Sequence, residues 1–101
     1  MNEYEVEFFA RCPENGVRIK YTLQIRTHIV VPVENILAAT ASLTNGYHEA
    51  FAERLRDGFG GLQKLTADHH GCRITTHRSG AAKTGAAWSA NIETAGNGSA
   101  A

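Results

Sequence analysis

The sequence predicts an α+β fold, a two-layer sandwich in which an antiparallel sheet carries two helices on one face. Three features lead to this prediction. Residues 4–27 alternate apolar and polar side chains, which is typical of strands with one buried face. Residues 33–59 repeat apolar side chains every three or four positions, as amphipathic helices do. Residues 62–77 return to a weaker alternation. The element order is therefore ββααββ, and one more strand over 84–93 is an alternative that would extend it.

The first hairpin has a register that the sequence specifies strongly. Residues 13–16 read Pro-Glu-Asn-Gly, in which Pro presets φ for a turn and Asn-Gly tolerates positive φ. If Cys12 pairs with Val17, the apolar side chains of both strands fall on one face. The expected pairs are Ala10 with Ile19, Phe8 with Tyr21, Val6 with Leu23, and Tyr4 with Ile25. A shift by one residue would expose them all to water, so we expect this register.

The polar face of this hairpin contains a candidate binding surface. It is acidic at one end and basic at the other, with the exposed aromatic Phe9 in the basic part. Phe9 could stack on a planar ligand between Arg18 and Lys20. The alternative, which we favour, is a solvated face with cross-strand ion pairs or a face covered by another subunit.

Two helices follow. Pro32 precedes the first, which we expect from about Val33 to Leu43. Thr44-Asn45-Gly46 interrupts the pattern, and Thr44 or Asn45 can cap the second helix, which Gly58 ends. His48 and Glu49 fall on its polar face, where we expect solvent. The apolar faces predict a core that contains Phe8, Tyr21, Leu23, Phe51, Leu55 and Phe59.

The last predicted hairpin is weaker. Its strands, 62–67 and 72–77, are separated by Asp68-His69-His70-Gly71, with Ala67 opposite Cys72 and Leu65 opposite Ile74. One long strand with a bulge at Gly71 is the alternative. We expect residues 1–94 to form a single domain and residues 95–101, rich in Ala, Gly and Ser, to be a flexible tail.

Composition limits the classes of function. The 101 residues suit one domain, and ten basic side chains balance ten acidic ones. A chain without net charge lacks the basic excess of a typical nucleic-acid binder, so we do not expect a nucleic-acid partner. Little charge repulsion opposes contact between copies of the chain, so we expect a homo-oligomer. No apolar run is long enough for a membrane span, and the N-terminus does not read as a secretory signal. Cys12 and Cys72 then read as buried, reduced thiols of a cytoplasmic protein.

The element order resembles that of the tunnelling fold of pterin- and purine-handling enzymes. The likeness lies in the order ββααββ alone, and no motif matches position by position, so we assign no family. The resemblance implies subunits whose sheets join edge to edge into a barrel. It also implies that a Glu would hold the substrate ring and that His or Cys side chains would bind zinc.

The segment 68–77 concentrates the side chains that are able to do chemistry. His70, Cys72, His77 and Asp68 are candidate zinc ligands, since imidazole and thiolate suit that ion. Their spacing fits none of the strong zinc patterns, so we expect no cofactor and keep zinc as the alternative. Cys72 with His70 or His77 could also form a thiolate–imidazole pair, but an inert thiol is the simpler interpretation.

Two hypotheses about function follow. The first is a small, soluble, non-catalytic binding or interaction module that presents a surface or a subunit-interface pocket to a small molecule or protein. Its candidate ligand-binding residues are Phe9, Arg18, Lys20, His69 and His70. The second is a small enzyme whose site, between subunits, uses segment 68–77 with zinc or on a purine- or pterin-like ring. An enzyme requires that several of these polar groups converge in one concave pocket.

Overall fold

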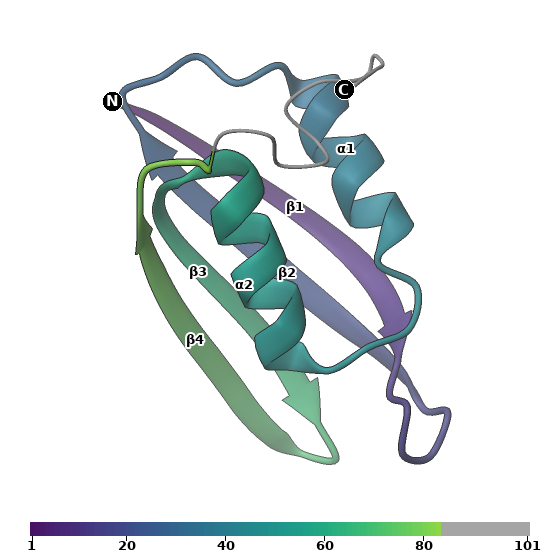
Figure 1. Cartoon of the computed structure of the whole chain (residues 1–101). Helices are drawn as coiled ribbons and strands as arrows, with labels where there is room; N and C mark the ends of the chain where they lie inside the picture. Colours follow the sequence, from purple (N-terminus) through teal and green to yellow (C-terminus); the bar gives the residue numbers. More distant parts are fainter. Residues whose placement is uncertain (84–101) are drawn as a thin grey trace.

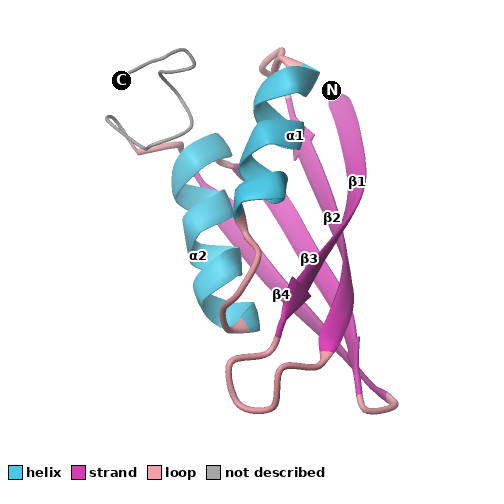
Figure 2. Ribbon diagram, turned by 90° about the vertical axis from the view of Figure 1, so that its right-hand side faces the viewer, coloured by secondary structure: helices cyan, strands magenta, loops and turns pink. Residues whose placement is uncertain are grey.

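The computed structural model describes residues 1–83, which fold into one antiparallel sheet covered on one face by two helices (Figures 1 and 2). The elements are β1 (Asn2–Arg11), β2 (Arg18–Thr27), α1 (Val33–Ser42), α2 (His48–Phe59), β3 (Gly61–His69) and β4 (Cys72–Gly80). The strands lie in the order β1-β2-β3-β4. This confirms the predicted fold class and the order ββααββ. The alternative of a further strand over 84–93 and the tail predicted at 95–101 both concern residues outside the described ones. Neither helix has the length and apolar character to span a membrane.

The β1–β2 hairpin has the predicted register. Ala10, Phe8, Val6 and Tyr4 lie opposite Ile19, Tyr21, Leu23 and Ile25. At the turn, the Cys12 amide donates to the Val17 carbonyl at 3.0 Å. The side chain of Asn15 accepts from the Val17 amide at 3.0 Å, and Gly16 adopts a φ of 72°. The turn chemistry and the apolar alternation therefore act together on the same register.

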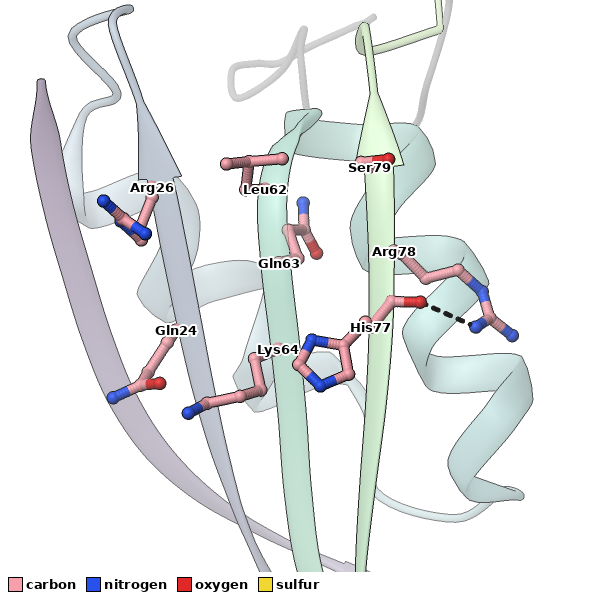
Figure 3. A pocket seen from close by; sticks show the side chains of 8 residues that line it. All are labelled: Gln24, Arg26, Leu62, Gln63, Lys64, His77, Arg78 and Ser79. Carbon is pink, nitrogen blue, oxygen red and sulfur yellow. Dashed lines mark hydrogen bonds between the residues drawn. The ribbon is translucent and has the colours of Figure 1, made fainter.

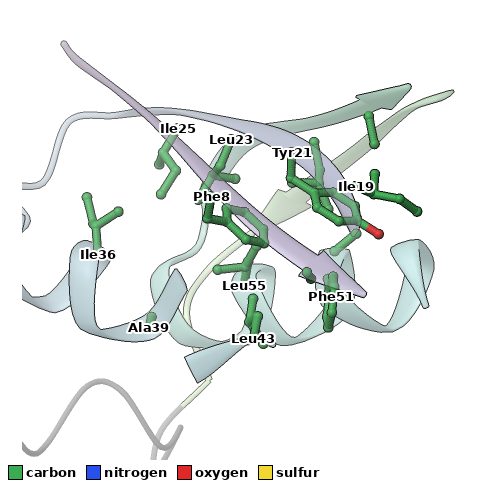
Figure 4. Packing of buried hydrophobic residues seen from close by; sticks show 14 of the residues in the cluster. Phe8, Ile19, Tyr21, Leu23, Ile25, Ile36, Ala39, Leu43, Phe51 and Leu55 are labelled. Carbon is green, nitrogen blue, oxygen red and sulfur yellow. The ribbon is translucent and has the colours of Figure 1, made fainter. Parts of the chain in front are cut away.

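The core lies between the sheet and the helices (Figure 4). Phe8 stacks on Tyr21 with ring centroids 5.1 Å apart, and Phe51 meets Tyr21 edge-on at 5.4 Å. The residues predicted for the core are all buried: Phe8, Tyr21, Leu23, Phe51, Leu55 and Phe59. Aromatic pairs at these separations add to the stability that comes from burial alone.

The helix ends differ from the prediction. Neither Thr44 nor Asn45 caps α2; Tyr47 is its N-cap residue, without a side-chain hydrogen bond. The link between the helices instead runs beside the end of β1, where the Arg11 amide donates to the Thr44 carbonyl at 2.9 Å. α2 also continues through Gly58 to Phe59, because Gly60, with a φ of 66°, makes the C-cap.

The β3–β4 segment is a hairpin, so the bulged single strand is excluded, but its register differs from the prediction by two residues. His69 pairs with Cys72, and Ala67 pairs with Ile74. The two-residue turn His70-Gly71 has φ values of 56° and 86°, as a type I′ turn requires. A shift of two residues leaves every side chain on its face, so alternation alone could not detect the error. Cys72 is exposed, against prediction, because it lies beside this turn on the edge strand, whereas Cys12 is buried.

Candidate functional site

The structure separates the side chains of segment 68–77. Asp68 pairs with Arg73 at 3.7 Å, and the Nε2 atom of His70 lies 3.1 Å from the side-chain nitrogen of Asn15. Cys72 and His77 point to opposite faces of β4, because an odd number of positions separates them. In residues 1–83 no three His, Cys, Asp or Glu side chains gather as metal ligands. Zinc therefore stays an alternative, and it would need ligands from elsewhere.

The surface predicted around Phe9 is used by contacts within the chain. The Arg18 guanidinium carbon lies 4.0 Å from the centroid of the Phe9 ring. Lys20 pairs with Glu7 at 3.3 Å, and both side chains are about half exposed. One face of the Phe9 ring thus already has a cation on it. These contacts agree with the alternative favoured from the sequence, in which charged side chains of this face pair across strands.

A small pocket opens on the other face of the sheet, between the N-terminal turn of α2 and the ends of β2, β3 and β4. Its volume is about 220 Å³, several times the roughly 30 Å³ that one water takes up in the liquid. Aromatic, imidazole and aliphatic side chains dominate its wall: Cys12, Ile19, Tyr21, Tyr47, His48, Ala67, His69 and Ile74. Gly46 and Glu49 complete it. We call this cavity the His48–His69 pocket.

His48 is the least satisfied polar side chain of this pocket. Both ring nitrogens are shielded from solvent, and neither makes a hydrogen bond. The ring centroid lies 5.6 Å from that of Tyr21. Burial lowers the pKa of His48, although interactions with the Leu65 backbone and the Glu49 carboxylate favour the charged ring. The structure thus favours a neutral imidazole, whose two nitrogens are one donor and one acceptor.

His69 brings a second imidazole to the same wall. Its Nε2 atom is buried without a hydrogen-bond partner, and its ring centroid lies 4.6 Å from that of His70. His69 was one of the predicted ligand-binding residues, and β3 directs it to the helix-covered face. His70, its neighbour in the turn, lies near Asn15 instead. The predicted pair of histidines is therefore divided between the pocket and the surface.

Tyr21, Tyr47 and Glu49 complete the lining of the His48–His69 pocket. The Tyr47 hydroxyl donates to Glu14 at 2.8 Å, and this hydrogen bond raises the pKa of Tyr47. Burial raises the pKa of Tyr21. Both phenols therefore stay neutral at ordinary pH. The Glu49 side chain is 82% exposed and pairs with Arg78 at 3.6 Å, so the rim has a carboxylate that solvent and a ligand can reach.

Sequence reasoning missed His48 because a helical wheel places it with the charged side chains of α2. In the first turn of a helix, however, a side chain is directed past the helix end. The His48 ring therefore lies at the end of the sheet, in the same pocket lining as the small side chain of Ala67. The available signal was a histidine in the first turn of a helix, after Tyr47, which has no capping side chain.

The fold is similar to that of a solved protein. The chain resembles the crystal structure of the archaeosine synthase QueF-Like in the apo form, with a TM-score of 0.54 and 12% sequence identity. The likeness covers 76% of this chain and 89% of that chain. At this identity it shows the fold alone. No protein-family model matches the chain, and no curated protein matches it.

Proposed function

We propose that this chain is a small ligand-binding domain that holds a planar, hydrogen-bonding ring in the His48–His69 pocket. The observation that carries the proposal is the pair of imidazoles with buried, unpartnered nitrogens in the wall of one cavity. Buried polar atoms almost always have a hydrogen-bond partner, so the two rings have hydrogen-bonding capacity that a ligand in this pocket can use. A ring with donors and acceptors on its edge would satisfy both histidines.

The shape and chemistry of the pocket support a flat ligand over a flexible one. Tyr21 and Tyr47 contribute aromatic surface, on which a planar ring can stack. Glu49 at the rim can accept hydrogen bonds from the ligand's N–H groups. The element order that this chain shares with the tunnelling fold supports a purine- or pterin-like ring.

Calorimetric titration of the full chain with guanosine and with biopterin tests the proposal. We expect at least one of them to bind, and His69→Gln to weaken binding about tenfold, the effect of losing one hydrogen bond worth roughly 1.4 kcal/mol. His70→Gln is the matched control, because His70 neighbours His69 in sequence and lies outside the pocket wall. Absence of binding by both compounds, or equal weakening in both variants, would reject the proposal.

Catalysis in the same pocket is a second candidate function. It is favoured by Cys12, a buried thiol in the wall that also contains His48. The solved protein with a similar fold is named as a synthase. Of segment 68–77, the pocket wall contains His69 and Ile74, so the predicted His/Cys site would use Cys12 in place of Cys72. Alkylation with iodoacetamide, in which the Cys12 thiolate forms a bond to carbon and iodide leaves, tests whether this thiol is a nucleophile. Mass spectrometry of the unchanged chain and of Cys12→Ser should show faster labelling of Cys12 than of Cys72, and a Cys12 that stays unlabelled would reject this second candidate.

We also propose that the chain forms a homo-oligomer through its sheet edges. In residues 1–83, β1 and β4 are the edge strands. Each edge presents backbone N–H and C=O groups that have no neighbouring strand within the described residues. These groups allow β1 of one copy to pair with β4 of the next. Sedimentation at micromolar concentration should give a mass above 10.9 kDa, and the monomer mass alone would reject the proposal.

A further inference from the structure

A second hollow lies on the helix-free face of the sheet, away from the His48–His69 pocket. Its volume is about 650 Å³, and it crosses β2, β3 and β4 (Figure 3). Its lining includes Gln24, Arg26, Leu62, Lys64, His77 and Ser79. We call it the Lys64–His77 trough. Figure 3 shows the Lys64 side chain extending toward Gln24, with the His77 ring on the neighbouring strand.

Half of the lysines and arginines on this face pair with a carboxylate. Arg26 pairs with Glu3 at 3.2 Å, Lys20 with Glu7 at 3.3 Å, and Arg73 with Asp68 at 3.7 Å. These pairs follow the rule that opposite charges stabilise neighbouring strands. The other three lysines and arginines of this face are Arg11, Arg18 and Lys64.

Lys64 differs from the other basic side chains of this face. Arg11 donates to the Gly16 carbonyl at 2.9 Å, and Arg18, directly opposite Arg11, lies 4.0 Å from the centroid of the Phe9 ring. In residues 1–83, Lys64 has neither a carboxylate partner nor a contact of these kinds. His77 stands directly opposite it on β4. A basic side chain without a partner, in the lining of a hollow, is available to an anionic ligand.

We propose that the Lys64–His77 trough binds the phosphate group of a small molecule. Lys64 supplies a point charge that suits phosphate, and His77 supplies a ring N–H donor. The Ser79 hydroxyl and the Gln24 amide lie in the same lining. Leu62, 51% exposed in this lining, offers apolar surface for the rest of the ligand. The chain has no net charge, so the attraction is local to the trough and is not a property of the whole surface.

Nuclear magnetic resonance titration of the full chain with inorganic phosphate tests this proposal, at constant pH and with chloride holding the ionic strength constant. We expect saturable shifts of the Lys64, His77 and Ser79 signals. Lys64→Gln and His77→Gln should each weaken binding about tenfold, as the loss of a charge-assisted hydrogen bond does. Lys20→Gln is the matched control, since Lys20 lies on the same face and is paired with Glu7. It should bind phosphate as the unchanged chain does.

Three results would overturn the proposal. The first is shifts that do not saturate or that spread over all basic residues. The second is equal weakening by Lys20→Gln and Lys64→Gln. The third is a single-stranded oligonucleotide that shifts the same signals at lower concentration per phosphate than inorganic phosphate, which would make the ligand a nucleic acid. His69→Gln should leave phosphate binding unchanged, so failure of this proposal is distinguishable from failure of the ring-binding one.

Discussion

Replacement of His48 by phenylalanine should stabilise the protein and abolish ring binding. The two ring nitrogens of His48 are buried without partners, and each such group costs about 1–3 kcal/mol. Phenylalanine removes both nitrogens and keeps an aromatic ring beside Tyr21, now 5.6 Å from the His48 centroid. Its slightly larger ring can expand into the adjoining cavity of about 220 Å³. Part of the gain is offset by local repacking, so we expect a net increase of about 1–3 kcal/mol in the free energy of unfolding.

Urea denaturation followed by circular dichroism measures this change. In a domain of this size each kcal/mol raises Tm by about 4–8 °C, so thermal melts provide a second reading. His70→Phe is the control, because His70 lies in the exposed β3–β4 turn and has a partner in Asn15. A His48→Phe variant that is less stable than the unchanged chain would show that the His48 nitrogens are satisfied in solution. A more stable variant that still binds the ring compound would show that His48 is not needed for ligand binding.

Three further outcomes are expected. Burial lowers the pKa of His48 from its ordinary 6.5, so the unfolded chain takes up the proton first. The free energy of unfolding should therefore fall as the pH drops below about 6.5, and less so in His48→Phe; equal pH profiles in urea melts would contradict this. Phe51→Ala should cost about 3–5 kcal/mol in the same melts, since Phe51 packs edge-on against Tyr21 and Phe8. Gly46→Ala should destabilise by about 1–3 kcal/mol, because its Cβ would lie 2.6 Å from the Phe51 ring; an unchanged denaturation midpoint would mean that the ring moves aside.

The sequence by itself determined the fold class and the β1–β2 register. Alternation over residues 4–27 required a pairing that places the apolar side chains of both strands on one face, and the turn at 13–16 selected the observed register among such pairings. The core residues, such as Phe51 and Leu55, followed from the helical repeat. These features were predictable because local propensity and burial lead to the same arrangement.

Only the tertiary structure decided the β3–β4 register and the composition of the candidate sites. The predicted and observed registers differ by two residues and leave side chains on the same faces, so turn geometry at His70-Gly71 made the choice. Helix periodicity placed His48 in water, yet its nitrogens are buried, because the start of α2 overlies the end of the sheet. Lys64 and His77 became neighbours through strand pairing. Contacts of this kind join segments distant in sequence, and periodicity within one segment carries no information about them.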